Sequence, residues 1–131
     1  MEARPKTFEY RASLDRAGIA LAEGGSPLEL AGAWTPEHLV LAGLLACSIE
    51  SLRHHAHRAG LELAAEGSAR GTVARRDEDG RFALVEVDVR VEARLDPAPE
   101  SLEELLAKAE RDCFIGASLT VTPSYDWAVG T

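Results

Sequence analysis

The amino-acid sequence predicts an α+β domain with an antiparallel sheet, a long buried central helix and a second, amphipathic helix. Three observations lead to this class. Hydrophobic residues make up 46% of the 131 residues, enough for one core. Residues 39–49 form a long apolar stretch of helical character, whereas residues 82–95 alternate with a period of two. The elements follow one another as strands, helix, hairpin, helix and strand, which is an α+β order.

Short strands are predicted before the central helix. Residues 7–14 alternate roughly between apolar and polar side chains, and residues 19–22 resume the pattern after a turn at 15–18. We expect these two strands to form a hairpin. A glycine-rich turn then precedes a third short strand at residues 28–30.

The central helix has clear signals at both ends. Thr35 is a plausible N-cap, Pro36 suits the first helical position, and Glu37 faces the positive end of the helix dipole. The helical pattern runs to about Ala59, where Gly60 ends it. The first half of this helix is apolar almost all round, so we expect it to be buried on most sides.

The second half of the chain reads as hairpin, helix and strand. Residues 61–75 and 82–95 are predicted to pair as a long hairpin around a polar turn. An amphipathic helix follows at residues 100–112, with Ser101 as a possible cap. Residues 118–129 are predicted to form the last strand. We expect one domain over residues 1–131 with a half-covered sheet, whose core a second copy of the chain would complete.

Composition and charge exclude several kinds of partner. The net charge is -8 and the 14 basic residues are scattered, so we expect neither nucleic acid nor an anionic membrane as a partner. No apolar run approaches the roughly 20 residues that span a bilayer. The first residues lack the apolar core of a signal peptide, so we expect a cytoplasmic protein.

Two cysteines, Cys47 and Cys113, are the residues most able to carry chemistry. Taken alone, each is more often a small buried hydrophobe than a reactive thiol. They do not form a CxxC pair, and we expect neither a metal site nor a cofactor. His54 and His57 share a helix face, but two ligands do not make a metal site, and a polar helix end is the simpler interpretation.

Two motifs resemble those of the OsmC/Ohr family of thiol-dependent peroxidases. The central helix carries Thr35-Pro36-Glu37-x-Leu39-x-Leu41-x-Gly43-x-x-Ala46-Cys47, similar to the family's helix signature. The segment before the last strand reads Cys113-Phe114-Ile115-Gly116-Ala117-Ser118-Leu119, where the family usually has proline in place of Phe114. The order of elements matches over nearly the whole chain.

The resemblance implies an OsmC-like fold and a peroxidase. Cys47 would attack the peroxide and Cys113 would resolve the resulting sulfenic acid as a disulfide. An external dithiol would then reduce that disulfide by exchange. The apolar helix around Cys47 favours organic hydroperoxides over hydrogen peroxide as substrates.

The resemblance also assigns Glu37 and Arg16 to the active site, with Arg11 as a close alternative to Arg16. An arginine beside a thiol lowers its pKa, and a glutamate can hold that arginine through a bidentate pair. On the residues alone, Glu37 is equally a carboxylate facing the helix dipole, and Arg16 a solvated turn residue. Glu37 lies ten positions before Cys47, about 15 Å along an unbroken helix. We therefore expect an obligate, intertwined homodimer in which Glu37 serves the partner's thiol.

Two other functions stay open at this point. The chain could be a non-enzymatic stress or binding dimer of the same fold with inert cysteines, or a redox sensor whose disulfide is the signal. A peroxidase needs an arginine at the thiol and a route from solvent, and the inert dimer lacks both. Trp34 and Trp127 are predicted to pack in the core or an interface.

Overall fold

The computed structural model describes residues 6–30, 32 and 34–130, and the chain divides into two compact units, residues 1–37 and 38–131. Residues 1–5, on which the expectation of no signal peptide partly depends, lie outside the described range. Because each unit is compact by itself, the single domain predicted for residues 1–131 stays a prediction.

The first unit holds a three-stranded antiparallel sheet in the order β1-β2-β3. Its strands are β1 (Ala12–Leu14), β2 (Ile19–Ala22) and β3 (Leu28–Glu29). The predicted hairpin is confirmed by the antiparallel pairing of β1 with β2, although the first strand is shorter than the pattern suggested. Asp15 fixes the turn, because its Oδ1 accepts hydrogen bonds from two backbone N–H groups, those of residues 17 and 19, at 2.9 Å each.

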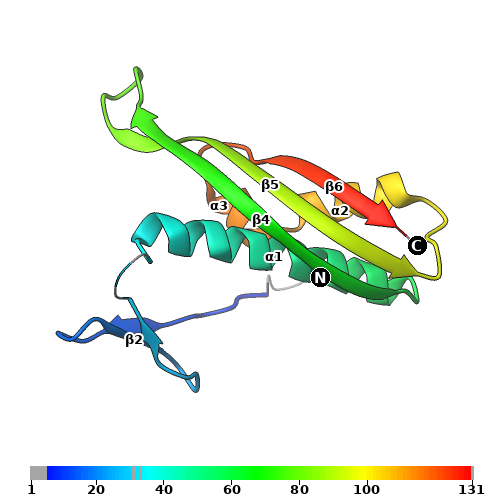
Figure 1. Cartoon of the computed structure of the whole chain (residues 1–131), viewed down its shortest axis with the longest axis horizontal. Coiled ribbons are helices and arrows are strands. Elements are labelled where there is room, and N and C mark those ends of the chain that lie inside the picture. The colour runs from blue at the N-terminus through cyan, green and yellow to red at the C-terminus, as the bar shows by residue number, and fades with distance from the viewer. Residues whose placement is uncertain (1–5, 31, 33, 131) are drawn as a thin grey trace, which may run out of the picture. The chain divides into compact units, whose positions relative to one another are not determined.

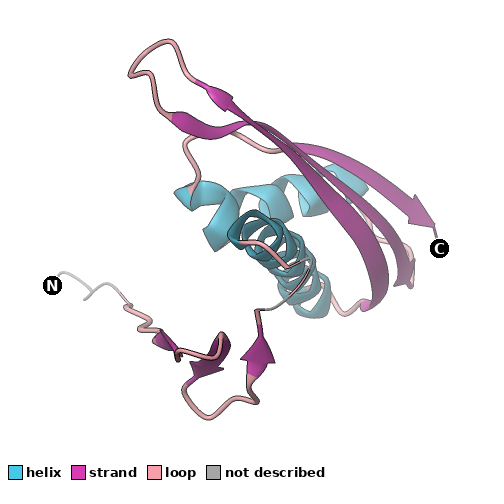
Figure 2. Ribbon diagram, turned by 60° about the vertical axis from the view of Figure 1, so that its left-hand side comes forward, coloured by secondary structure: helices cyan, strands magenta, loops and turns pink. Residues whose placement is uncertain are grey.

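The second unit is a sheet with helices on one of its faces (Figures 1 and 2). Helix α1 lies along the sheet, with α2 and α3 beside it on the same face. The elements are α1 (Pro36–Arg58), which begins at the unit boundary, β4 (Glu62–Arg75), β5 (Phe82–Asp96), α2 (Leu102–Arg111), α3 (Phe114–Ser118) and β6 (Ser124–Gly130).

The α+β class is confirmed, with one difference in strand direction. Strands β4 and β5 form the predicted antiparallel hairpin, but β6 pairs with β5 in parallel, so this sheet is mixed. The reason is the connection: α2 and α3 carry the chain back along the helical face of the sheet, so β6 starts at the same end as β5. Strand direction of this kind depends on the crossover and not on local residue pattern.

The end of the chain also differs from its prediction. Residues 114–118, partly assigned to a strand, form the short helix α3, and β6 begins only at Ser124. Cys113 caps α3, since its Sγ accepts a hydrogen bond from the Gly116 N–H at 3.5 Å. Pro123, which has no N–H for a strand ladder, directly precedes β6.

The core lies between β5 and the helices. The predicted alternation of β5 holds from Val87 to Leu95, whose inward side chains are at most 5% exposed. It fails at Val85, which is 39% exposed, because the β4–β5 register shifts between Thr72 and Val73 and leaves Val85 without a partner. The helices and the junction between α2 and α3 contribute further buried apolar side chains: Leu44, Leu52, Ala56, Ala109 and Cys113.

Within one chain, α1 is buried along one stripe and not on most sides as predicted. Its buried residues are Leu44, Ser48, Ser51, Leu52 and Ala56. Val40, Ala42 and Ala46, on other faces of the helix, are exposed. The reason is that the sheet and α2 cover only one side of this helix.

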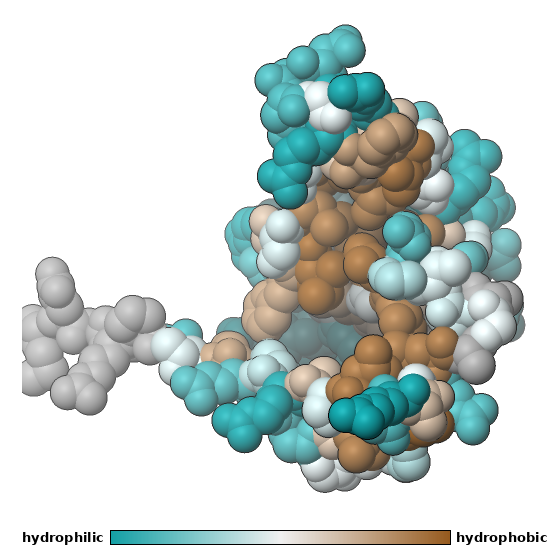
Figure 3. Space-filling view, turned by 90° about the vertical axis from the view of Figure 1, so that its left-hand side faces the viewer, coloured by the Kyte–Doolittle hydropathy of each residue, from teal (hydrophilic) through white to brown (hydrophobic). Residues whose placement is uncertain are grey.

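Several large apolar side chains are exposed on the second unit. Figure 3 shows apolar side chains gathered beneath the polar tip of the β4–β5 hairpin. The exposed large hydrophobic residues of this unit are Val40, Val73, Phe82, Val85, Phe114 and Ile115. Among the described residues, no helix is both long enough and apolar enough to span a membrane.

Candidate active site

The thiols of Cys47 and Cys113 lie near enough for each to shift the pKa of the other. Cys47 lies midway along α1 and is partly exposed, whereas Cys113 lies between α2 and α3 and is 0% exposed. Both are free thiols. The fold thus brings together two cysteines that are far apart in the sequence, with one of them open to solvent.

Burial and neighbours set the pKa of Cys47. Burial raises this pKa, and contact with the Cys113 thiol raises it further. Backbone N–H groups of Ile115 and Phe114 donate toward the Cys47 sulfur and lower the pKa without cancelling these effects. Cys47 is therefore mainly a thiol in the environment that the second unit supplies.

Cys113 has the opposite balance. Burial acts to raise its pKa, but hydrogen bonds from Ser48, the Gly116 N–H, Cys47 and Tyr125 outweigh burial and lower it. Of the two thiols, Cys113 thus loses its proton more readily within this unit, although solvent does not reach it.

Two hydroxyl groups that the sequence analysis missed complete this cluster. Ser48 Oγ lies 3.5 Å from Cys113 Sγ and 3.0 Å from the Tyr125 hydroxyl, and it donates to the Leu44 carbonyl at 2.8 Å. Burial raises the pKa of Tyr125 to about 12. The sequence feature that could have indicated this cluster is Ser48, a polar residue one helical turn after the buried Leu44.

Gly116 lies beside the Tyr125 hydroxyl and the Cys113 sulfur. A Cβ atom at residue 116 would lie 3.4 Å from that hydroxyl, 3.5 Å from Cys113 Sγ and 3.6 Å from Leu44. These distances show that the start of α3, α1 and β6 converge on one point. The sulfur of Cys113 lies at that point.

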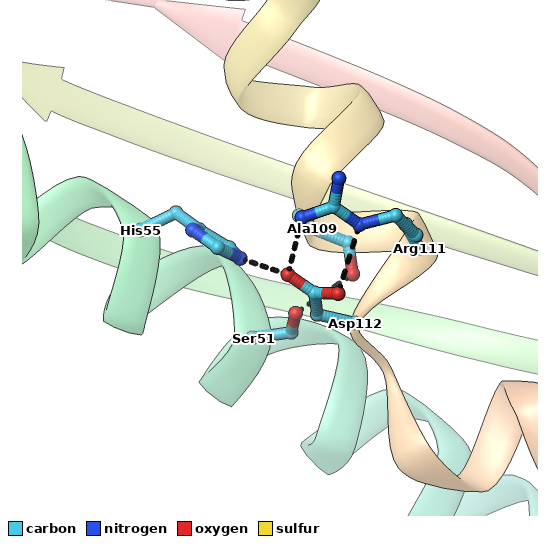
Figure 4. Close-up of polar contacts among 5 residues, drawn as sticks. All are labelled: Ser51, His55, Ala109, Arg111 and Asp112. Atoms are coloured by element: carbon cyan, nitrogen blue, oxygen red, sulfur yellow. Dashed lines mark hydrogen bonds and ion pairs between the residues drawn. The ribbon is translucent and has the colours of Figure 1, made fainter. Parts of the chain in front are cut away.

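A second polar cluster holds the residue before Cys113 (Figure 4). Asp112 Oδ2 lies 2.7 Å from His55 Nε2, and Arg111 binds both carboxylate oxygens at 2.9 and 3.0 Å. One turn earlier on α1, Ser51 Oγ donates to the Ala109 carbonyl at 2.7 Å. The end of α2 is therefore fastened to α1 directly before Cys113.

The other predicted site residues belong to the first unit. Arg16 lies in the turn between β1 and β2, Arg11 precedes β1, and both are exposed. Glu37 is exposed in the first turn of α1. Since α1 runs unbroken from Pro36 to Arg58, Glu37 is about 15 Å along the helix axis from Cys47 of its own chain. The association of these three residues with the thiols remains a prediction.

The histidines and tryptophans have other partners. His55 binds Asp112 and is packed edge-on against His54, with 5.1 Å between ring centres. In the part of the chain that the structure describes, no group of three or more metal-binding side chains occurs. Trp127 packs against the core, stacks on Tyr125 at 5.4 Å between ring centres, and donates to Glu110 at 2.9 Å. Trp34 is 51% exposed.

The thiol pair can carry out dithiol–disulfide chemistry without a bound group. Two thiols in contact can join as a disulfide when a two-electron oxidant converts one of them to a sulfenic acid. The exposed member, Cys47, is the one that a dissolved oxidant can reach. The buried member, Cys113, is already beside it.

Comparison with known proteins places this chain in a family. The sequence model of the OsmC-like protein family matches residues 26–127. No curated protein matches the chain.

Several solved structures share the fold. An OsmC-like protein of unknown function from Vibrio cholerae has a TM-score of 0.78 at 17% identity, and the match covers 92% of this chain and 99% of that one. OhrB, the organic hydroperoxide resistance protein of Bacillus subtilis, has a TM-score of 0.60 at 20% identity over 95% and 98% of the two chains. A protein from Legionella pneumophila, described as organic hydroperoxide resistance protein OsmC, has a TM-score of 0.61 at 23% identity over 98% and 100%.

Proposed function

The chain belongs to the OsmC-like protein family, and from this membership and its paired thiols we propose that it is a thiol-dependent hydroperoxide reductase. The observation that carries the proposal is the contact between a partly exposed Cys47 and a fully buried Cys113. We assign the attack on the peroxide to Cys47 and the resolving step to Cys113. The activity requires a reducing compartment such as the cytoplasm, where both cysteines start as thiols.

The reaction needs only the two thiols, a peroxide and a reductant. The Cys47 thiolate attacks one peroxide oxygen, the O–O bond breaks, and the second oxygen leaves as an alcohol after taking a proton. The Cys47 sulfenic acid then reacts with Cys113 to form a disulfide and water. An external dithiol restores both thiols by exchange. No cofactor or metal enters these steps.

Apolar groups beside Cys47 support organic hydroperoxides as substrates. The backbone of Phe114 and Ile115 touches the Cys47 sulfur, and their side chains are 59% and 38% exposed. An alkyl group bound there would cover apolar surface that water now contacts. Two of the solved structures of the same fold are named as organic hydroperoxide resistance proteins, which agrees with this choice.

Activation of Cys47 requires a nearby cation. None of the groups of the second unit that act on the pKa of this thiol is a cation. We assign this role to Arg16, held by Glu37, with Arg11 as the alternative. A guanidinium beside Cys47 would lower the thiol pKa and stabilise the negative charge that develops on the departing oxygen. This step would reverse the order of acidity between the two cysteines.

The same assignment implies an intertwined homodimer. Glu37 is about 15 Å along an unbroken helix from its own Cys47, so it cannot hold an arginine against that thiol. We propose that Glu37 and Arg16 of one protomer serve Cys47 of the other. The exposed small residues Ala42 and Ala46 allow two α1 helices to approach closely across a two-fold axis.

The decisive experiment is stoichiometric. Fully reduced protein is mixed with one equivalent of cumene hydroperoxide, and the loss of peroxide and of free thiols is counted. We expect one peroxide consumed and two thiols lost per chain, and neither loss in Cys47→Ser. Full consumption by Cys47→Ser would overturn the assignment.

A redox sensor is the second candidate, and the thiol pair itself favours it, because redox-sensing cysteines are accessible to solvent and often lie beside a resolving cysteine. A sensor forms its disulfide once and is reduced slowly, whereas a peroxidase turns over many times with dithiothreitol present. An inert stress or binding dimer would keep both thiols after peroxide treatment.

A further inference from the structure

We propose that Ser48 and Tyr125 are positioning residues that hold Cys113 and support its negative charge while the disulfide forms. The proposal rests on the proposed function, in which Cys113 resolves the oxidised Cys47. It assigns a role to two side chains that neither of the sequence motifs contains.

The geometry places both hydroxyls at the sulfur of Cys113. Ser48 is 1% exposed, and its Oγ lies 3.5 Å from Cys113 Sγ and 3.0 Å from the Tyr125 hydroxyl. The Tyr125 hydroxyl also lies near enough to lower the pKa of Cys113. On its other side, the same sulfur accepts the Gly116 N–H at 3.5 Å. A thiolate here would be surrounded by donors.

Ser48 has one proton and two acceptors. Its O–H donates to the Leu44 carbonyl at 2.8 Å, and a hydroxyl cannot donate to two acceptors at full strength at once. When Cys113 is a thiol, the bond to Leu44 satisfies Ser48. When Cys113 loses its proton, the Ser48 O–H can turn to the sulfur, and Leu44 keeps its helical hydrogen bond.

Tyr125 supports this rearrangement as a permanent donor. Burial raises the pKa of its hydroxyl to about 12, so it keeps its proton at every pH at which the enzyme works. Its O–H can donate to Ser48 Oγ and so strengthen the bond from Ser48 to the sulfur. The stack of Tyr125 on Trp127 fixes the ring in this position.

In the step that forms the disulfide, the Cys113 sulfur attacks the sulfur of the Cys47 sulfenic acid. The S–S bond forms and the S–O bond breaks. The leaving hydroxide takes the proton that Cys113 has released, and water is the product. The hydroxyl pair is neither consumed nor oxidised, because it only stabilises the charge on Cys113 before the attack.

The experiment compares Ser48→Ala and Tyr125→Phe with Ser51→Ala as a matched control. Ser51 is also a buried serine on α1 that donates to a backbone carbonyl, but its partner is Ala109 and not a thiol. Two readouts are used: the ultraviolet absorbance of thiolate as a function of pH, and quenched single-turnover mass spectrometry of sulfenic acid and disulfide.

We expect Ser48→Ala to raise the pKa of Cys113, read from the thiolate titration with Cys47 replaced by serine, by about one unit. In the protein that keeps Cys47, it should slow disulfide formation about tenfold, as for one lost hydrogen bond to a charged group. Sulfenic acid should still form on Cys47 at an unchanged rate. Tyr125→Phe should shift both quantities in the same direction by a smaller amount. Ser51→Ala should change neither.

Two outcomes would overturn the proposal: an unchanged thiolate titration in both folded hydroxyl variants, or equal effects in Ser51→Ala. If Ser48→Ala fails to fold by circular dichroism, Tyr125→Phe decides alone. The titration needs no peroxide, so it tests the hydroxyl pair even if the protein consumes none. If the protein consumes no peroxide, the proposed function fails, and the titration alone decides whether the hydroxyl pair acts on Cys113.

Discussion

The Cys47 and Cys113 thiols lie near enough to shift each other's pKa, yet only Cys47 is partly exposed to solvent. This asymmetry assigns different chemistry to two residues of the same type. A dissolved molecule meets Cys47 first, and Cys113 can act only on what happens there.

Removing Cys113 should therefore separate the two steps. We expect Cys113→Ser to consume about one peroxide per chain and then stop, with a sulfenic acid on Cys47 that dimedone traps. Excess peroxide should convert it to sulfinic acid. Mass spectrometry measures each product, and sustained turnover by this variant would contradict the assignment of Cys113 as the resolving thiol.

The exposed apolar side chains near Cys47 should give a preference for organic peroxides. We expect kcat/KM for cumene hydroperoxide to exceed that for hydrogen peroxide by at least about tenfold, since burying one aromatic-sized group is worth roughly 1.5–3 kcal/mol. Phe114→Ser should reduce this ratio, and Phe82→Ser should not, although Phe82 at the hairpin is even more exposed, at 73% against 59% for Phe114. Equal efficiencies for both peroxides would count against the apolar site.

The shared active site can be tested by mixing two inactive variants. Light scattering should give about twice the 14.1 kDa chain mass. Cys47→Ser and Glu37→Ala should each be inactive alone, and together they should regain up to about a quarter of the wild-type activity, because half of the chains enter mixed dimers with one intact site. Arg16→Ala in place of Glu37→Ala should complement in the same way.

Arg11→Ala serves as the control for that experiment, and its loss of activity would move the role from Arg16 to Arg11. An active monomer would be incompatible with the shared site.

The Asp112 cluster should make the stability of the protein depend on pH in the acidic range. Arg111 lowers the pKa of Asp112 to about 2, with a smaller contribution from His55. Because the pKa is depressed in the folded state, the stabilisation is complete above about pH 4 and is lost as the pH falls towards 2. The denaturation midpoint should fall over this range, and Asp112→Asn should lower it at pH 7 and flatten the profile.

Arg111→Gln removes the largest cause of that shift and should give an intermediate profile. Identical profiles for all three proteins would show that the cluster does not contribute to stability.

Any substitution of Gly67 in β4 that adds a side chain should destabilise the protein. A Cβ atom at Gly67 would lie 2.2 Å from the carbonyl oxygen of Arg90 and 3.1 Å from the Cα of Val91. Gly67→Ala must push β4 and β5 apart, and we expect it to reduce the free energy of unfolding by about 1–3 kcal/mol or more. The exposed neighbour Ser68 is the control, since Ser68→Ala should change stability by less than about 0.5 kcal/mol.

The sequence predicted the elements with a strong local signal. The β2 strand matches its prediction residue for residue, and the bounds of α1 differ by a residue, because Pro36 and Gly60 are strong markers of helix ends. Helix α3 was missed because five residues are too few to show a helical period. The parallel direction of β6 was missed because it depends on a crossover, which leaves no local pattern.

The candidate site was predictable only in part. Both cysteines were singled out from the sequence and received their roles from the family resemblance, whereas their proximity follows from packing that no local pattern reveals. Ser48 and Tyr125 were missed because neither stands in a motif, and only the fold brings β6 beside α1. One chain covers a single stripe of α1, and the burial of its other sides stays a prediction that depends on the second copy.

The stack of Trp127 on Tyr125 gives the protein an optical probe of its own chemistry. The indole stacks on the ring whose hydroxyl is joined to Cys113 through Ser48, so a change at that sulfur alters the surroundings of the indole. The other tryptophan, Trp34, can be replaced by phenylalanine to leave one emitter. Fluorescence of that single-tryptophan protein would then follow oxidation and reduction in real time, without an added dye.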